Sequence, residues 1–94
     1  MNKYETVIIL NPDITKEQTN NVITKVENYI KNNGKITNTN TMGTKKLAYT
    51  IKKHTHGYYY IIEFESNPTA IYELQRIYRI TDEIIKFITI KKDN

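Results

Sequence analysis

Apolar positions along the chain fall into six segments, four with the composition of β-strands and two with the spacing of amphipathic helices. The strand segments are rich in isoleucine, threonine and tyrosine, and glycine, proline or asparagine bounds them. The predicted strands are residues 3–10, 36–51, 58–65 and 84–90. A turn is expected at residues 53–57, and Gly43 is expected to mark a bulge or bend in the second strand.

A capping box begins the first predicted helix, which spans residues 15–33. The Thr15 hydroxyl can accept a hydrogen bond from a free helical amide, and Gln18 can reach back to the cap residue. Apolar residues then recur at helical spacing, which gives this helix one apolar face. Asn33 and Gly34 are expected to end it, because glycine tolerates the left-handed conformation that closes many helices.

A second helix is predicted over residues 68–79. Asn67 is its expected N-cap, and Pro68 takes the first helical position, where a missing amide proton is not needed. The apolar stripe of this helix consists of Ile71, Leu74, Ile77 and Tyr78. Residues 91–94 are expected to form a polar tail.

The predicted order of elements, β-α-β-β-α-β, is the split βαβ arrangement of ferredoxin-like domains. Right-handed crossovers put both helices on the same face of a four-stranded antiparallel sheet. The sequence therefore predicts an α+β, ferredoxin-like fold in which residues 1–94 form a single domain. The opposite face of the sheet is left open, and its chemistry bears on function.

Side chains alternate along each strand, so one set packs under the helices and the other faces away. In the first, third and last strands, only one of the two sets contains a charged residue, and a charge is costly to bury under helices. We assign the charged set to the open face and the other set, with Ile85, Phe87 and Thr89 in the last strand, to the core. The predicted open face comprises Glu5, Val7, Ile9, Tyr59, Ile61, Glu63, Lys86, Ile88 and Ile90. Its apolar centre favours a partner site, with self-association or a merely solvated face as the alternatives.

The composition indicates a folded chain without cysteine chemistry. The apolar fraction of 38% is low, but sixteen isoleucines and eight tyrosines lie in compact periodic runs that disordered chains lack. The absence of cysteine excludes disulfides and thiolate metal sites. The sequence shows neither a basic and apolar leader nor a membrane-length apolar run, so we expect a cytoplasmic protein, bacterial or organellar.

The net charge of +4 is unevenly distributed. No acidic residue occurs between Glu27 and Glu63, whereas six lysines fall in that stretch. One-sided charge of this kind is typical of a surface that binds a polyanion, and nucleic acid is the favoured partner. An ordinary solvated basic surface is the alternative.

Residues that could carry catalysis or hold a metal are sparse. His54 and His56 form a His-x-His pair in the predicted turn, but two ligands without a third make a weak metal site. The chain contains only three glycines and no glycine-rich phosphate loop. We therefore expect no enzymatic activity, no metal or other cofactor, no small-molecule substrate and no membrane partner.

Residues 56–61 (HGYYYI) resemble the aromatic signature of RNA-recognition-motif domains, which share this order of elements. That resemblance implies a module for single-stranded RNA that stacks bases on Tyr58 and Tyr60. Two residues depart from the motif, Tyr59 where a small residue is usual and Glu63 where an aromatic is usual. The motif would also put Tyr58 and Tyr60 on the open face, although strand alternation assigns them to the core.

Several short segments resemble the bacterial small-subunit ribosomal protein six family in their order and spacing over nearly the whole chain. They are Lys3-Tyr4-Glu5, Leu10-Asn11-Pro12, Gly43-Thr44-Lys45-Lys46-Leu47-Ala48-Tyr49, Gly57-Tyr58-Tyr59 and Arg79-Ile80-Thr81-Asp82. The resemblance implies a βαββαβ structural protein of the small ribosomal subunit that binds RNA and supports subunit assembly and translation. It also implies two partners, the central domain of small-subunit ribosomal RNA and ribosomal protein eighteen.

The resemblance and the open-face assignment together give candidate binding residues. The implied RNA contacts would neutralise phosphates rather than read bases. They are Lys45, Lys46 and Lys86, with Lys3 and Lys92 as further candidates. The expected protein-partner face comprises Val7, Ile9, Tyr59, Ile61 and Ile88.

Overall fold

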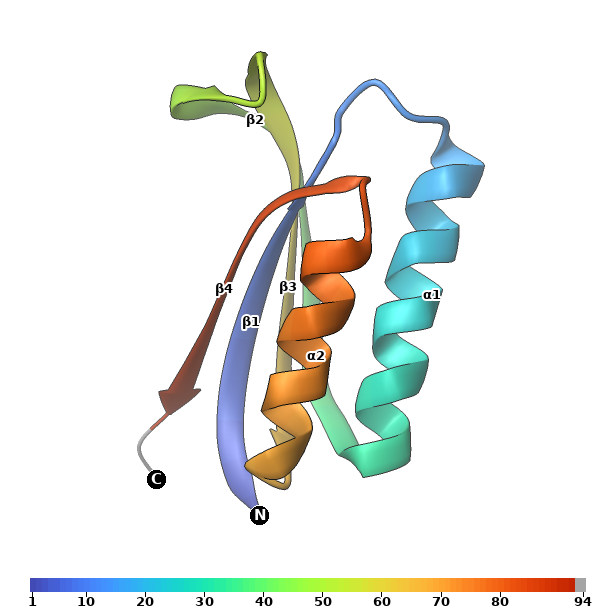
Figure 1. The fold of residues 1–94 in the computed structure, drawn as a ribbon, viewed down its shortest axis with the longest axis vertical. Coiled ribbons are helices and arrows are strands. Elements are labelled where there is room, and N and C mark those ends of the chain that lie inside the picture. Colours follow the sequence, from blue (N-terminus) through green and yellow to red (C-terminus); the bar gives the residue numbers. More distant parts are fainter. Residues whose placement is uncertain (93–94) are drawn as a thin grey trace.

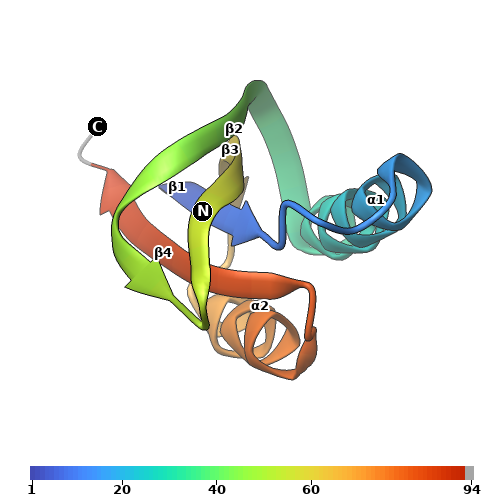
Figure 2. The ribbon, with the colours of Figure 1, turned by 90° about the horizontal axis from the view of Figure 1, so that it is seen from above.

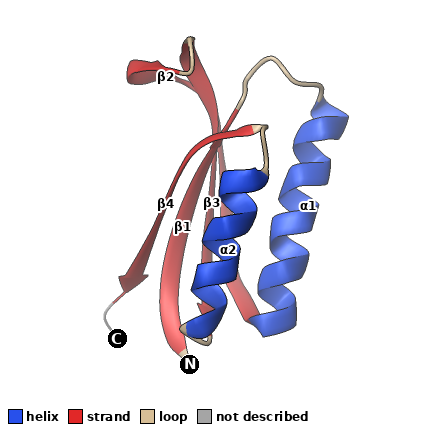
Figure 3. Ribbon diagram, viewed as in Figure 1, coloured by secondary structure: helices blue, strands red, loops and turns tan. Residues whose placement is uncertain are grey.

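The computed structural model describes residues 1–92 and arranges them as one sheet with two helices. The elements are β1 (Asn2–Leu10), α1 (Lys16–Asn33), β2 (Gly34–Ile51), β3 (His54–Ser66), α2 (Thr69–Ile80) and β4 (Ile84–Lys92) (Figure 1). The sheet is antiparallel with the strand order β2-β3-β1-β4, and both helices cover the same face of it (Figures 2 and 3). This arrangement confirms the predicted α+β, ferredoxin-like fold. Within residues 1–92, neither helix has the length and apolarity needed to span a membrane.

The predicted capping box begins α1. The Gln18 amide donates to the Thr15 hydroxyl at 3.1 Å, and the Thr15 amide donates to Oε1 of Gln18 at 2.9 Å. Two amide protons that helix formation leaves without partners are thereby satisfied. The apolar stripe of α1 then packs against the sheet through Val22, Val26 and Ile30, all buried.

Gly34 ends α1 for a different reason from the one predicted. Its φ of 172° is extended, so the expected left-handed closure is wrong. The chain passes directly from α1 into β2 at this point, and Gly34 lies opposite Ser66 at the end of β3. A Cβ at position 34 would overlap the main-chain carbonyl oxygen of Glu65. The glycine is required because the two backbones approach so closely.

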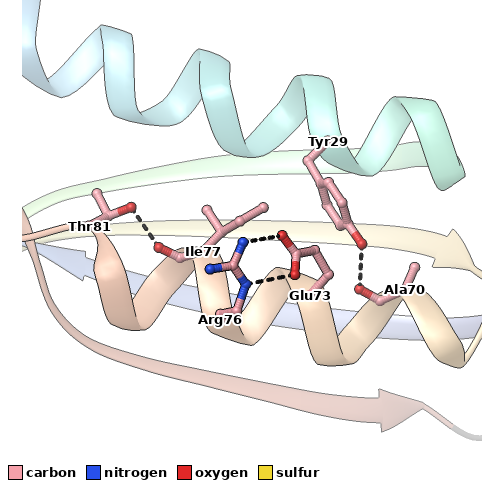
Figure 4. A network of polar contacts seen from close by, with 6 residues as sticks. All are labelled: Tyr29, Ala70, Glu73, Arg76, Ile77 and Thr81. Carbon is pink, nitrogen blue, oxygen red and sulfur yellow. Dashed lines mark hydrogen bonds and ion pairs between the residues drawn. The ribbon is translucent and has the colours of Figure 1, made fainter.

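Main-chain carbonyl oxygens accept the hydrogen bonds that cap the start of α2 and link it to α1. Asn67, the predicted side-chain cap, instead accepts through its carbonyl from the Ala70 amide at 3.1 Å. The hydroxyl of Tyr29 on α1 donates to the Ala70 carbonyl at 2.8 Å (Figure 4). Burial raises the pKa of this hydroxyl, and the nearby Glu73 carboxylate raises it further. The donor form of Tyr29 is therefore kept over the whole neutral range.

The main core lies between the helices and the covered face of the sheet. Its strand residues alternate as predicted, with Tyr4, Ile8 and Leu10 from β1 among them. Thr6 lies on the same side and is fully buried, but its hydroxyl lies 3.0 Å from the Tyr78 hydroxyl and 2.9 Å from that of Thr89. Hydrogen bonding of this kind offsets the cost of burying the hydroxyl groups of Thr6 and Tyr78. Burial raises the pKa of Tyr78 far above its ordinary value.

A bulge at the start of β4 overturns one core assignment. Leu10 pairs with Ile84, whereas Ile9 pairs with Lys86, so Ile85 is the extra residue between the two pairs. Ile84 therefore enters the main core, and Ile85 packs with Ile9 on the opposite side of the sheet. The prediction that Ile85 faces the helices is wrong because strict alternation does not survive an inserted residue.

The connection between β2 and β3 is shorter than predicted. Positive φ angles of 48° and 70° occur at Lys52 and Lys53, which form a two-residue hairpin turn. Residues 54–57, expected in the turn, belong to β3 instead. The bulge predicted at Gly43 is confirmed, with a register shift there and a φ of 75°.

The expected polar tail is also shorter than predicted. Lys91 and Lys92 belong to β4, where they lie opposite Tyr4 and Lys3 of β1. The other two residues of that tail, Asp93 and Asn94, lie outside the described residues. Pairing with β1 satisfies backbone groups that a free tail would leave to solvent, so the strand continues to the end of its partner.

Alanine substitutions at the two glycines separate steric overlap from backbone strain. Gly34→Ala should lower the free energy of unfolding by about 3 kcal/mol, because Glu65 main chain blocks the new methyl group. Gly43→Ala meets nothing within 4 Å and should cost only about 1–2 kcal/mol, the penalty for a positive φ. Urea unfolding of both variants tests this order. Equal losses would contradict the close-approach explanation.

Candidate functional site

The open face carries an apolar row across three strands. Val7 of β1 lies directly opposite Ile61 of β3 on one side and Ile88 of β4 on the other. The Ile88 side chain is 52% exposed, and Ile90, two residues further along β4, is 50% exposed. Val7 and Ile61 are partly exposed. We call Val7, Ile61 and Ile88 the apolar row. It lies on the side of the sheet away from both helices, where strand alternation placed it.

One end of the open face is covered by the chain itself. Beyond the Gly43 bulge, β2 and the start of β3 form a hairpin arm, residues 44–57, that arches over the sheet toward β4 (Figure 2). Leu47 of the arm packs on Ile9 and Ile85, and Tyr59 packs against this small cluster. Ile9 is consequently only 7% exposed. The prediction that Ile9 is an accessible partner-face residue is wrong, because it stabilises the arm instead.

A charged group closes the other end of the open face. Glu5 and Glu63 are direct cross-strand neighbours, a pairing of like charges that is unfavourable by itself. The Lys92 ammonium forms ion pairs with both carboxylates. Hydrogen bonds from Lys92 and then Asn38 lower the pKa of the Glu63 carboxyl, and the Glu63 carboxylate raises the pKa of Lys92. The Lys92 ammonium is therefore engaged in ion pairs within the fold.

The five candidate RNA-binding lysines occupy two separate regions. Lys45 and Lys46 are exposed on the hairpin arm, opposite Gly57 and His56 of β3. Lys86 joins them, because its ammonium donates to the hydroxyl of the arm residue Tyr49. The remaining two, Lys3 and Lys92, pair with each other in register at the far ends of β1 and β4. The first three lysines therefore lie on the hairpin arm or in contact with it, and the last two lie apart.

Tyr49 is an exposed residue of this region that sequence reasoning missed as a candidate. Its side chain is 62% exposed, and its hydroxyl accepts from the Lys86 ammonium at 2.6 Å. Tyr49 lies with Lys45 and Lys46 in residues 43–49, the segment that resembles the ribosomal protein family, and this was its only signal in the sequence. Neither strand alternation nor charge singled it out.

The tyrosines proposed as base-stacking residues lie on the wrong side of the sheet. Tyr60 is 8% exposed, and its hydroxyl donates to the Glu27 carboxylate of α1 at 2.8 Å. Burial raises the pKa of Tyr60, as does the hydrogen bond to Glu27. Tyr58 packs against the main core under the helices. The RNA-recognition-motif interpretation is therefore wrong, because both rings face the helices instead of the open face.

The two histidines lie at the beginning of β3, close to the loop between β1 and α1. Nδ1 of His54 is 3.7 Å from a carboxylate oxygen of Asp13, and Nδ1 of His56 is 3.0 Å from the Thr55 hydroxyl. In the part of the chain that the structure describes, histidine and acidic side chains form no group of three suited to a metal ion. His54 lies opposite Ile51 next to the hairpin turn, and His56 lies opposite Lys46 within the arm.

Comparison with known proteins gives one consistent family. The family model described as Ribosomal protein S6 matches residues 3–91. The Small ribosomal subunit protein bS6 of Caldanaerobacter subterraneus is 40% identical over the full length of both chains. That of Helicobacter acinonychis is 43% identical over all of this chain and 67% of its own. A crystal structure of 30S ribosomal protein S6 from Thermotoga maritima is 34% identical with a TM-score of 0.92, covering 97% of this chain and 87% of that one.

Acid titration tests the role of Lys92 within the fold. Because the folded-state pKa of Glu63 is lowered, its contribution to stability is complete above the ordinary carboxyl pKa and is lost as pH falls through the lowered value. Lys92→Met should therefore flatten the decline in unfolding free energy between about pH 5 and pH 3. Lys91→Met removes an exposed charge from the next residue and should leave the decline unchanged. Identical acid profiles for the two variants would contradict the assignment.

Proposed function

The chain belongs to the ribosomal protein S6 family and is a structural component of the small ribosomal subunit rather than an enzyme, and we propose how it binds there. Its hairpin arm contacts small-subunit ribosomal RNA of the central domain, and its open face receives ribosomal protein eighteen. The observation that carries this proposal is the adjacency of the apolar row and an arm bearing exposed lysines. Residues 1–94 act as a single binding domain on a ribosome in the cytoplasm.

The RNA half of the proposal rests on the charges of the arm. Lys45 and Lys46 are exposed, and Lys52 and Lys53 at the turn are exposed as well. No acidic residue lies anywhere in β2 or in β3 before Glu63 to neutralise them. Phosphate contacts made by such lysines release counterions and give affinity without base specificity. Lys86 extends this basic surface onto β4, whereas Lys92 contributes little because it is paired with two carboxylates.

The protein half of the proposal rests on the apolar row. Half-exposed isoleucines at positions 88 and 90 sit beside Val7 and Ile61, and a charged group bounds them at one end. An apolar centre with a polar rim is the usual anatomy of a protein-binding surface. Ribosomal protein eighteen, docked there, would lie next to the hairpin arm. RNA and partner would then share a composite surface, and linkage requires each to strengthen the binding of the other equally.

Charge reversal on the arm tests RNA binding. Lys45→Glu with Lys46→Glu should weaken binding to a central-domain RNA fragment and should reduce the slope of log affinity against log salt by about 2, roughly one per lysine. The matched control replaces Lys25 and Lys31, exposed lysines of α1, with glutamate. This control changes the net charge by the same amount on another surface. If the salt slope falls equally in both double variants, the arm has no specific role and the RNA responds only to the net charge of the protein.

An aspartate in the apolar row tests partner binding. Ile88→Asp should abolish binding of ribosomal protein eighteen while the domain stays folded, because a half-exposed aspartate is hydrated until the partner desolvates it. RNA binding should weaken only when the partner is present. Ile80→Asp is the matched control, since Ile80 is 57% exposed on α2 behind the sheet. Calorimetric titration of both variants decides the matter, and normal partner binding by Ile88→Asp would refute the open-face assignment.

A further inference from the structure

Tyr49 is a large aromatic ring displayed on the hairpin arm. It is 62% exposed, whereas Tyr58 and Tyr60 are turned into the core side of the sheet. The arm itself is held in place by Leu47, which is buried against Ile9 and Ile85 two residues before Tyr49. The ring is therefore attached to a fixed part of the arm. An exposed aromatic on a fixed support loses little conformational freedom when a ligand packs against it.

The Lys86 ammonium fixes the ring by its edge. Nζ lies 2.6 Å from the Tyr49 hydroxyl oxygen and 5.0 Å from the ring centroid. The hydroxyl oxygen already stands one ring radius and one C–O bond away from the centroid. An ammonium at these two distances lies beyond the hydroxyl end of the ring instead of above its centre. The contact therefore orients Tyr49 and leaves the faces of the ring clear of the ammonium.

The surroundings of the ring suit a ligand that is both flat and negatively charged. Lys86 of β4 contributes one positive charge at the edge of the ring. Lys45 and Lys46 lie on β2, the same strand as Tyr49. The chain from residue 28 to residue 62 contains no acidic residue that would repel an anion. A nucleobase provides the flat surface, and the phosphates on either side provide the charge. Aromatic rings stack with all four bases, because every base has a π-face.

We propose that Tyr49 is a stacking platform for an unpaired nucleobase, with Lys86 holding the ring and contacting the neighbouring phosphate. This inference rests on the proposed RNA-binding function of the arm and adds a base contact to a surface otherwise limited to phosphates. It also transfers the aromatic role from β3 to the end of β2. A helical or fully paired RNA presents no free base face, so the site selects bulges, loops and single strands.

A single-tryptophan reporter tests the stacking directly. The chain contains no tryptophan, so Tyr49→Trp creates one fluorophore at the proposed site. A short single-stranded RNA, titrated at low ionic strength, should quench this emission strongly because the indole stacks with a base. Tyr72→Trp is the matched control, since Tyr72 is 79% exposed but lies on α2. Its emission should change little over the same titration.

Affinity measurements separate stacking from charge. Tyr49→Leu should weaken binding of the RNA about tenfold, whereas Tyr49→Phe keeps the ring and should retain most of the affinity. Tyr72→Leu should have no effect. An oligonucleotide of the same length with abasic sites keeps its phosphates, and it should bind wild type and Tyr49→Leu equally. Thermal unfolding of each variant confirms that the fold is intact.

The outcomes distinguish failure of this inference from failure of the proposed function. If Lys45→Glu with Lys46→Glu weakens RNA binding but Tyr49→Leu does not, the arm binds phosphates alone and the stacking platform is refuted. If neither change matters, the proposed RNA-binding function fails as well. If Tyr49→Leu weakens binding of ribosomal protein eighteen and leaves RNA binding intact, the ring belongs to the protein interface and the inference is overturned.

Discussion

Both helices cover one face of the sheet and leave the other uncovered (Figure 2), so the alternating side chains of the inner strand β1 face two different environments. One set, which includes Ile8 and Leu10, is buried under the helices, and the other faces away from them. A polar side chain in the covered set needs hydrogen-bond partners, because burying it without them is costly. Thr6 accordingly lies within hydrogen-bonding distance of the Tyr78 and Thr89 hydroxyls. The open face is the necessary consequence of a two-layer fold, whereas the apolar row on it is a property of this sequence.

Strand length accounts for the hairpin arm. β2 and β3 contain 18 and 13 residues, whereas β1 contains 9, so β1 cannot pair with their distal parts. The unpaired length needs another surface for its apolar side chains. The Gly43 bulge bends β2, and the extra residue in β4 turns Ile85 outward to meet Leu47. The same packing that stabilises the arm brings its lysines and Tyr49 beside the open face.

Sequence patterns predicted the features that depend on local chemistry. The capping box at Thr15 and alternation along β1 were right, because each is decided by residues close together in the chain. The errors concern contacts between distant segments. Gly34 is required by the backbone of β3, and Ile9 is covered by the hairpin arm. Ile85 was misplaced because one inserted residue reverses the alternation, and no composition signal marks it.

The two ends of the open face differ in charge. Lys92 sits between two carboxylates, so that end offers little net attraction to a polyanion. The arm has no carboxylate of its own, so no acidic side chain within it weakens the positive potential of its lysines. Under the proposed function, an RNA binds at the end of the sheet where Tyr49 stands, and the apolar row between the two ends is left for the protein partner. In the same proposal, the group formed by Glu5, Glu63 and Lys92 lies beside the row and helps to fix the register of the partner without attracting RNA.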